Sequence, residues 1–476
     1  MALNLFNTLT RTIQPFEPIE KDGKNVGLYC CGPTVYDYAH IGNWRTFVFA
    51  DLVRRALQFQ GFTVRHVMNI TDVEDKIIQR AQERQVSLES FTRSYEQAFL
   101  EDLQCLNCLK PHQTPRATDH IAEIIGMIQQ LIQRGFAYRT PDGSVWFSIH
   151  KYAAAGHQYG RLLPIQLDEL RVGERVATDE YAKEAASDFA LWKARVTSDG
   201  PIFWPSPFGE GRPGWHIECS AMSVKALGTT FDLHLGGEDL KFPHHEDEIA
   251  QSEGATGRPF ARFWLHGAHL LVEGKKMSKS LGNFFTLRDL LARGFSGREV
   301  RCLLLTAHYR ETFNFTLDGL HAARSSLSRL DECLDKLKAA ASPQAPAISS
   351  TTHAASVELL KTFEEAICDD LNISAAWAAV FQWVSAINRQ AATAELNPAE
   401  ASVALAAWQR VDSVLGMGSR PTASVPPEIM ALAQERTEAK KNRDFKRADA
   451  LRAQLKALGW VIEDTSDGIK LKKSEP

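Results

Sequence analysis

The sequence predicts an α/β protein: a Rossmann-like parallel sheet split by an insertion, followed by an α-helical bundle and a small C-terminal domain. Three observations support this prediction. An apolar strand, a helix and a second strand follow one another at residues 26–29, 46–59 and 62–70, which is a βαβ unit with a right-handed crossover. Strand patterns return at 231–235 and 263–272, after an irregular stretch rich in aromatic residues, glycine and proline. The last third of the chain has a helical pattern.

Length and composition exclude several classes of protein. The chain has 476 residues, enough for about three domains. With 44% apolar and 24% charged residues it is neither mainly disordered nor of low complexity, and its net charge of −4 excludes a polybasic nucleic-acid binder. Eight cysteines are too few for a disulfide scaffold. We find no signal peptide and no apolar run of about 18 residues, so we expect a cytoplasmic protein without a membrane anchor.

The insertion and two linkers give the domain boundaries that we expect. Residues 88–135 have a helical pattern and residues 137–206 are irregular. Two stretches, 339–356 and 418–427, are typical of linkers, and the first is rich in Ala, Ser, Thr and Pro. We therefore expect a sheet domain at 1–120 and 211–315, an inserted domain at 121–210, a helical bundle at 316–417 and a C-terminal domain at 418–476.

Two motifs indicate phosphate binding. HIGN at residues 40–43 stands at the predicted strand-to-helix junction, where backbone N–H groups and the helix dipole attract phosphate. Alone, this pattern fits a capping or packing histidine better. KMSKS at residues 276–280 is a loop that can close over a triphosphate and neutralise charge on the reacting phosphorus, although alone it fits a solvated basic turn. We expect both motifs to border the same sheet, and the pair is more specific than either motif.

Four residues of metal-binding type are spread along the chain. His244 and Glu248 are four apart on a predicted helix, so their side chains share one face, and Cys31 and Cys219 offer thiolates from other segments. Together they can form a tetrahedral zinc site. The residues alone leave this open, because such a His/Glu pair is more often a solvated helix face and a single cysteine is more often a small buried hydrophobe.

At these motifs the sequence resembles the class I aminoacyl-tRNA synthetases, whose signatures are HIGH and KMSKS, and within them the cysteinyl-tRNA synthetase family. The resemblance runs from Phe6 to Asp464. The chain departs from the signature at Asn43, which can donate a hydrogen bond to phosphate but carries no charge. The narrower match rests on YCCGPTVYD at 29–37, NITD at 69–72, GRPGWHIECSAM at 211–222 and FPHHEDE at 242–248.

The resemblance implies a catalytic sheet domain, an anticodon-binding C-terminal domain and a ligase that forms carbon–oxygen bonds in protein biosynthesis. ATP and L-cysteine would give cysteinyl-adenylate and pyrophosphate, and the 3′-terminal adenosine of tRNA(Cys) would take the acyl group on its 2′-hydroxyl. Mg²⁺ would accompany ATP. The implied residues are His40, Asn43, Lys276 and Lys279 for catalysis, Gly42, Asp239 and Lys279 for ATP, and Thr71 and Trp215 for cysteine.

The resemblance also implies one Zn²⁺ per chain, bound by Cys31, Cys219, His244 and Glu248 and in contact with the substrate thiolate. A hydrophobic pocket separates near-isosteres such as cysteine and serine by only about 1–3 kcal/mol. Zinc deprotonates a thiol and binds sulfur strongly, whereas an alcohol is a poor ligand. No editing domain is then required.

Three other cysteines lie in patterns that could suggest a metal or redox site, and we interpret them as packing residues. Cys30 precedes Cys31 on a strand, so its side chain points to the opposite face. Cys105 and Cys108 form a CxxC pair that has neither a second pair nor a thioredoxin-like context.

Residues 429–458 are predicted to be one basic amphipathic helical stretch, with eight Lys or Arg and four Asp or Glu. It fits contacts with a tRNA anticodon through Lys440, Phe445 and Asp449, and the alternative is a solvated amphipathic helix.

Two rival functions can be distinguished from a cysteinyl-tRNA synthetase by this C-terminal stretch or by the motifs. One rival is a related ligase that joins cysteine to an amino sugar in mycothiol synthesis, but it lacks the C-terminal domain. The other is a non-catalytic, zinc-stabilised nucleic-acid-binding paralogue, which need not keep Lys276, Lys279 and all four metal candidates together. We expect a monomer whose partners are ATP, L-cysteine and tRNA(Cys).

Overall fold

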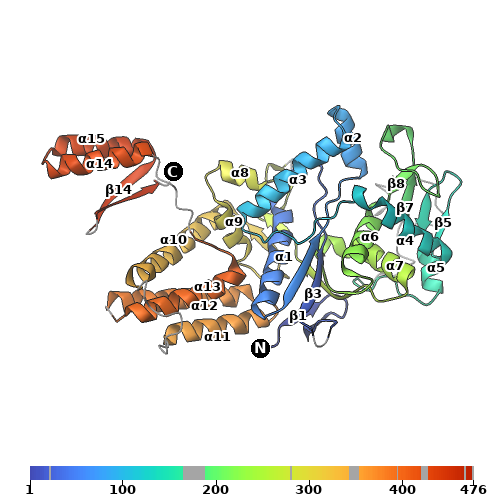
Figure 1. Ribbon diagram of the computed structural model, residues 1–476, viewed down its shortest axis with the longest axis horizontal. Coiled ribbons are helices and arrows are strands. Elements are labelled where there is room, and N and C mark those ends of the chain that lie inside the picture. The colour runs from blue at the N-terminus through green and yellow to red at the C-terminus, as the bar shows by residue number, and fades with distance from the viewer. Residues whose placement is uncertain are drawn as a thin grey trace. The chain divides into compact units, whose positions relative to one another are not determined.

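The structure, a computed structural model, describes residues 1–20, 23–163, 188–278, 281–341, 353–393, 395–419, 427–465 and 468–473. Its contacts divide the chain into two compact units, Met1–Gly418 and Ser419–Pro476. The first unit contains the sheet, the insertion and the helical bundle (Figure 1).

A four-stranded parallel sheet in the order β10-β9-β3-β4 lies at the centre of the first unit. Helix α1 makes the crossover from β3 to β4 and packs on the sheet through its buried residues. This confirms the Rossmann-like parallel sheet. Because β3 lies between β4 and the much later β9, the chain changes direction between β3 and β9, which is where open parallel sheets bind ligands. The elements are β3 (Asn25–Cys30), α1 (Ile41–Phe59), β4 (Thr63–Met68), β9 (Phe231–Gly237) and β10 (Ala261–Gly267).

Two adjacent helices stand beside the carboxyl ends of these strands. They are α6 (Trp215–Leu227), which precedes β9, and α7 (His244–Thr256), which follows it after a short 3₁₀ turn at Glu238–Lys241. The remaining elements on this side of the chain are β1 (Asn4–Asn7), β2 (Thr12–Pro15), α2 (Asp75–Glu83) and α3 (Leu88–Cys105).

A small antiparallel sheet in the order β5-β6-β7-β8 takes three strands from the stretch 137–206, so the expectation that this stretch is irregular is wrong for those described residues. Its fourth strand lies just beyond the expected insertion at 121–210. Three of its four strands have only three residues, too few for a periodic pattern to be visible in the sequence. The sheet packs in a hydrophobic cluster that includes Phe147, Leu191 and Trp192 and also takes in residues of α6 and α7. The elements are α4 (Ile121–Gln133), β5 (Ala137–Arg139), β6 (Val145–Phe147), α5 (Ile149–Ala154), β7 (Phe189–Ala194) and β8 (Gly211–Pro213).

The strand predicted at 263–272 is two strands, and the second one leaves the main sheet. Strand β11 pairs with β12 and β13 in a separate three-stranded sheet. The KMSKS segment begins in β12, so the expectation that both motifs border the same sheet is wrong. These elements are β11 (Leu270–Val272), β12 (Lys275–Lys276), α8 (Leu287–Ala292), α9 (Gly297–Leu304) and β13 (Phe313–Phe315).

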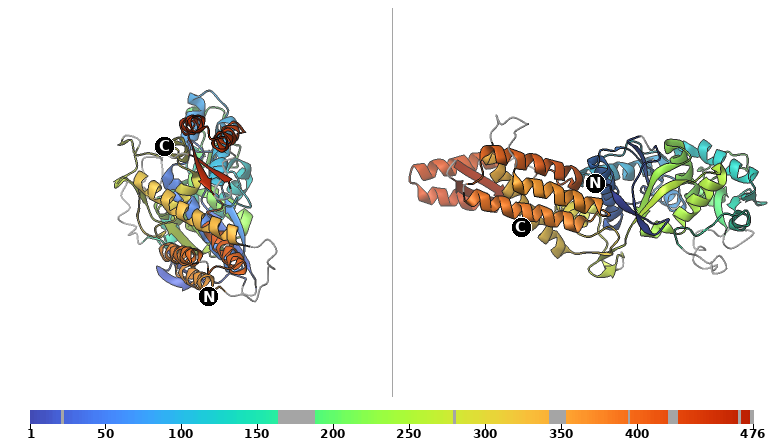
Figure 2. Two further views of the ribbon diagram at one scale, coloured as in Figure 1. Left: turned by 90° about the vertical axis from the view of Figure 1, so that its left-hand side faces the viewer. Right: turned by 90° about the horizontal axis from the view of Figure 1, so that it is seen from below.

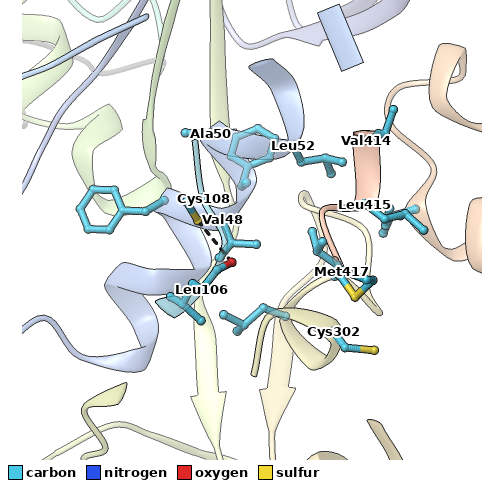
Figure 3. Packing of buried hydrophobic residues seen from close by; sticks show 14 of the residues in the cluster. Val48, Ala50, Leu52, Leu106, Cys108, Cys302, Val414, Leu415 and Met417 are labelled. Atoms are coloured by element: carbon cyan, nitrogen blue, oxygen red, sulfur yellow. Dashed lines mark hydrogen bonds between the residues drawn. The ribbon is translucent and has the colours of Figure 1, made fainter. Parts of the chain in front are cut away.

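Four helices complete the first unit and pack against one another, as the two further views in Figure 2 show. Helix α13 also packs on α1, and Figure 3 shows Val48 and Leu52 of α1 close to Val414 and Leu415. The bundle consists of α10 (Leu317–Ala340), α11 (Ala354–Cys368), α12 (Ile373–Ala392) and α13 (Pro398–Leu415).

The C-terminal unit corrects two predictions. The helical stretch at 429–458 is two helices, because Arg443 has a positive φ of 61° and Asp444 caps the second helix by accepting a hydrogen bond from the backbone N–H of Arg447. A hairpin of two strands follows where helix was expected, and Trp460 and Ile462 pack on the helices. The elements are α14 (Pro427–Lys441), α15 (Phe445–Ala457), β14 (Trp460–Thr465) and β15 (Gly468–Lys473). Among the described helices of the whole chain, none is both long and apolar enough to span a membrane.

Candidate functional site

Possible metal ligands from three segments meet at the carboxyl ends of β3 and β9, the switch point where the chain changes direction in the sheet. Cys31 directly follows β3, and its backbone N–H donates to the carbonyl of Leu235 on β9 at 3.2 Å. Gly32 is required next to it, because a Cβ there would lie 1.7 Å from the carbonyl oxygen of Asn69. Helix α6 supplies Cys219, and the first turns of α7 supply His244 and Glu248.

The four predicted metal residues lie within one small volume. One donor atom from each of Cys31, Cys219, His244 and Glu248 lies within 4.8 Å of the others, and all four residues are buried. The two sulfur atoms are 3.9 Å apart, His244 Nε2 is 3.0 Å from Glu248 Oε1, and Cys31 Sγ is 3.4 Å from the same oxygen. A tetrahedral zinc shell with bonds of about 2.0–2.3 Å has donor–donor edges of about 3.3–3.8 Å. The donor types and their spacing therefore fit a zinc ion.

The charges in this cluster favour a metal ligand set. Burial alone would raise the pKa of Glu248, but the neighbouring His234 and His244 lower it to about 2. The hydrogen bond from Cys31 outweighs burial and lowers the pKa of the Cys219 thiol to about 6. Burial raises the pKa of the Cys31 thiol well above its usual range. One thiolate and one carboxylate are thus stable side by side in a buried site.

Three buried histidines next to this cluster escaped the sequence reasoning. His234 Nε2 lies 2.8 Å from Glu248 Oε2, and His245 Nε2 lies 3.4 Å from Cys31 Sγ. His266 Nε2 is 2.8 Å from His245 Nδ1. For His234 and His266 the signal in the sequence is a polar residue inside the apolar strand patterns at 231–235 and 263–272, and His245 lies in the FPHHEDE stretch at 242–248.

The HIGN segment forms a capping box at the start of α1. His40 Nδ1 accepts from the backbone N–H of Asn43 at 3.2 Å, and Asn43 Oδ1 accepts from the backbone N–H of His40 at 3.1 Å. The structure therefore gives Asn43 a role in ending the loop and beginning the helix, which the sequence reasoning did not consider.

The KMSKS segment adjoins this helix start. A Cβ on Gly42 would lie 3.5 Å from Met277 Cε, and the N–H of Ile41 donates to the carbonyl of Phe285 at 2.9 Å. Lys276 is exposed on β12, and Lys279 lies outside the described residues.

Asn283 organises the same loop and was not among the predicted site residues. Its Oδ1 accepts from the N–H of Ser278 at 2.8 Å, and its Nδ2 donates to the carbonyls of Val272 and Lys276 at 3.2 Å.

Of the residues predicted for cysteine and ATP, Trp215 contacts the metal cluster. Trp215 is 39% exposed, and its ring lies 4.6 Å from that of His244, between centroids. It borders a pocket together with Val73, Glu74 and His216. Thr71 is buried and accepts a hydrogen bond from Asn69 Nδ2 at 3.2 Å. Asp239 is exposed in the turn after β9, beside Gly237.

The remaining predicted residues lie elsewhere. Lys440, Phe445 and Asp449 are exposed on α14 and α15 of the C-terminal unit, and Phe445 is 61% exposed. Cys30 is buried on β3, and Cys108 is buried where Arg301 donates to its sulfur at 3.5 Å, whereas Cys105 at the end of α3 is exposed.

Family models match nearly the whole chain. The catalytic domain of tRNA synthetases class I (C) matches residues 16–325, the DALR domain matches 362–418, and the cysteinyl-tRNA ligase anticodon binding domain matches 422–470. The chain is 47% identical to the cysteine–tRNA ligase of Chlamydia felis over 99% of its own length and 98% of that protein, and 48% identical to that of Chlamydia muridarum over 99% and 100%.

Solved structures show the same fold at low identity. Methionyl-tRNA synthetase of Mycobacterium tuberculosis in complex with methionyl-adenylate has a TM-score of 0.58 at 15% identity, covering 83% of this chain and 90% of that one. The ternary complex of an Agrobacterium radiobacter K84 LeuRS with tRNA and LeuAMS has a TM-score of 0.59 at 12% identity, covering 84% and 85%.

Proposed function

The chain belongs to the cysteine–tRNA ligases of class I, and we propose that its buried Cys31, Cys219, His244 and Glu248 hold the zinc ion that selects cysteine. The chain's reaction is the ATP-dependent activation of L-cysteine and its transfer to the 3′ end of tRNA(Cys). The observation that carries the proposal is the convergence of these four donors at the switch point, at distances that match a tetrahedral zinc shell.

Selection of cysteine follows from the chemistry of this donor set. A bound zinc ion supplies a Lewis-acidic position that a substrate thiolate fills well and a serine hydroxyl fills poorly. The exposed ring of Trp215 against His244 forms a wall of the amino-acid pocket, and the buried Thr71 lies two residues before Val73, which lines the same pocket. His234 holds Glu248 in place by a hydrogen bond at 2.8 Å.

Adenylate formation takes place where the two phosphate motifs meet. A carboxylate oxygen of cysteine attacks the α-phosphorus of ATP, a new P–O bond forms, and the bond to the leaving pyrophosphate breaks. At the start of α1, the helix dipole and the backbone N–H of Gly42 attract phosphate, and the side chains of His40 and Asn43 donate hydrogen bonds to it. Lys276 and Lys279 neutralise charge that develops on the phosphates, and Mg²⁺ accompanies ATP. Asp239, exposed after β9, accepts hydrogen bonds from the ribose.

Transfer requires tRNA(Cys) to be bound at two places. The 2′-hydroxyl of its terminal adenosine takes the cysteinyl group in the first unit, and AMP leaves. The C-terminal unit binds the anticodon, where Lys440 neutralises phosphate, Phe445 stacks on a base and Asp449 accepts hydrogen bonds. The match of an anticodon binding domain to residues 422–470 also opposes the amino-sugar ligase, which lacks such a domain. We place this reaction in the cytoplasm, with a monomeric enzyme.

A pair of cysteine variants tests the proposal. Cys219→Ala should reduce cysteine-dependent ATP–pyrophosphate exchange at least about 100-fold, because it removes one donor of the metal site. Cys30→Ala, which changes a buried cysteine one residue from Cys31, should leave exchange near the wild-type rate. Chelation of the wild type should abolish exchange, and added Zn²⁺ should restore it. Exchange that survives both Cys219→Ala and chelation would disprove the zinc site. In a second assay, the wild type should charge tRNA(Cys) with labelled cysteine and not with labelled serine.

A further inference from the structure

We propose that the site contains a second, inner position for a thiophilic divalent cation, formed by Cys31, His234, His245 and Glu248. One donor atom from each residue lies within 4.8 Å of the others, and all four residues are buried. The set shares Cys31 and Glu248 with the outer set, which also uses Cys219 and His244. One thiolate, two imidazoles and one carboxylate are a donor combination that suits Zn²⁺ or Co²⁺.

The spacing of the inner donors supports coordination by all four residues. Cys31 Sγ is 3.4 Å from both His245 Nε2 and Glu248 Oε1. His245 Nε2 is 4.0 Å from Glu248 Oε1, and His234 Nε2 is 2.8 Å from Glu248 Oε2. These separations bracket the edges of about 3.3–3.8 Å expected for a tetrahedral shell. The outer donors lie 3.0–3.9 Å apart and the inner donors 2.8–4.0 Å apart, so the distances are compatible with an ion in either set.

The inner set has a supporting hydrogen-bond chain of its own. His245 Nδ1 is 2.8 Å from His266 Nε2, and His266 Nδ1 is 2.8 Å from Thr8 Oγ1. A histidine that binds a metal through one ring nitrogen is usually held by a hydrogen bond at the other. Here the chain fixes the ring of His245 so that Nε2 faces Cys31, and it involves neither Cys219 nor His244.

The two positions differ in their access to substrate. His244 of the outer set lies beneath the exposed ring of Trp215, which borders the pocket. His234 of the inner set stacks on Trp264, with ring centroids 4.3 Å apart, and also contacts Tyr29. Both of these aromatic residues are fully enclosed in a hydrophobic cluster. An ion at the inner position is therefore shielded from the substrate thiolate.

Shared ligands make the two positions alternatives for a single ion. Cys31 and Glu248 are needed by both sets, so an ion that moves inward gives up Cys219 and His244 and gains His234 and His245. The inner position is a resting place for the metal, in which the enzyme keeps its ion but cannot bind the substrate sulfur. This conclusion rests on the proposed function only for the role of the outer set.

Cobalt titration of the metal-free full chain distinguishes the two sets without measuring activity. The wild type should bind one Co²⁺ with the charge-transfer absorption of two thiolates. The variant C219S/H244N should still bind one Co²⁺, now with the absorption of one thiolate, and adding H234N/H245N should abolish binding. The variant H234N/H245N alone should keep the two-thiolate spectrum of the outer set.

Several results would overturn the inner position. If the wild type binds two Co²⁺ ions, the two positions do not share ligands. If C219S/H244N binds Co²⁺ and the further substitutions H234N/H245N do not weaken this binding, the two histidines are not ligands of the inner position. If C219S/H244N keeps a native near-ultraviolet circular dichroism spectrum but does not bind Co²⁺, the inner position does not exist. If that variant does not fold, Cys219→Ala alone replaces it and should bind Co²⁺ with a one-thiolate spectrum that loses intensity when H234N/H245N is added. Absence of a two-thiolate spectrum in the wild type would instead contradict the outer zinc site.

Discussion

Asn43 has a structural role at the end of the HIGN segment. Its side chain closes the capping box with His40, and this role explains why an uncharged amide suffices at that position. Asn43→Ala removes one of the two hydrogen bonds and should lower the free energy of unfolding by about 0.5–2 kcal/mol. Asn43→Gln keeps an amide that can close the box and should recover most of this loss. Denaturant unfolding measures both, and equal stability of Asn43→Ala and the wild type would contradict the capping role.

His66 on β4 should make the first unit sensitive to acid. It is buried, neither ring nitrogen has a hydrogen-bond partner among the described residues, and burial lowers its pKa to about 3. Since the unfolded chain has the ordinary histidine pKa of about 6.5, only the unfolded state binds the proton between these values. Stability due to His66 is therefore complete above about pH 6.5 and falls below it, by up to about 1.4 kcal/mol per pH unit. His66→Phe should unfold with a shallower pH dependence over that range, and an unchanged dependence would contradict the assignment.

The residues of the outer metal set could be predicted because the sequence carries two independent signals for them. His244 and Glu248 have helical spacing, and Cys31 and Cys219 lie in stretches that match a family. The ligand role stays a prediction, although the structure brings the four together. His234, His245 and His266 were missed because no spacing in the sequence joins them: His234 and His266 lie on β9 and β10, and His245 lies beside His244 on α7.

At the scale of elements, one buried arginine links four segments of the first unit. Arg301 of α9 pairs with Asp51 of α1 at 2.6 Å, and its Nε and Nη1 donate to the carbonyls of Leu415 at the end of α13 and Leu106 after α3. Figure 3 shows the apolar residues that pack around this point, including Leu106 and Leu415. The guanidinium therefore satisfies backbone groups at the ends of two helices that the core would otherwise leave unpaired.

Arg301→Ala should be among the most destabilising single substitutions in the chain. It leaves the buried carboxylate of Asp51 with Arg55 as its remaining ion-pair partner and should cost about 3–5 kcal/mol of unfolding free energy. Arg195→Ala, which breaks the exposed pair with Glu210, should cost less than about 1 kcal/mol. Denaturant unfolding compares the two variants. Similar losses in both would show that burial of the arginine does not matter.

Elements were predictable where their patterns are long. The βαβ unit and the helices beyond residue 317 follow from sustained periodicity, whereas strands of three residues in the insertion carry none. The break between α14 and α15 depends on the backbone of Arg443, a residue type that gives no turn signal. The separation of the KMSKS segment into its own sheet depends on the pairing of β11 with β13, which lies about 40 residues further along the chain.

At the scale of the whole molecule, the two units should separate the two steps of the reaction. The C-terminal unit has its own hydrophobic cluster, formed by residues of that unit alone, so removal of residues 419–476 should leave the first unit folded. The truncated chain should keep cysteine-dependent ATP–pyrophosphate exchange near the wild-type rate, and its charging of tRNA(Cys) should fall at least about 10-fold because phosphate and stacking contacts are lost. Steady-state kinetics of both reactions measure this, and unchanged charging would contradict the anticodon role.

The overall charge was a poor guide to the partner of this protein. The value of −4 averages an acidic body with the basic stretch at 429–458 and the lysines of the KMSKS segment, which are the parts proposed to contact phosphate. Local composition therefore carried information that the total did not.

The position of β3 between β4 and β9 also constrains how the protein is synthesised. One edge of β3 pairs with β4 soon after both leave the ribosome, but its other edge waits for β9, roughly 200 residues later. Until then a nascent chain presents an unpaired apolar strand edge, the kind of surface that promotes mispairing between neighbouring chains. The proposed metal site cannot form before α7 has been translated, so the ion proposed for it could enter only after more than half of the first unit has been made.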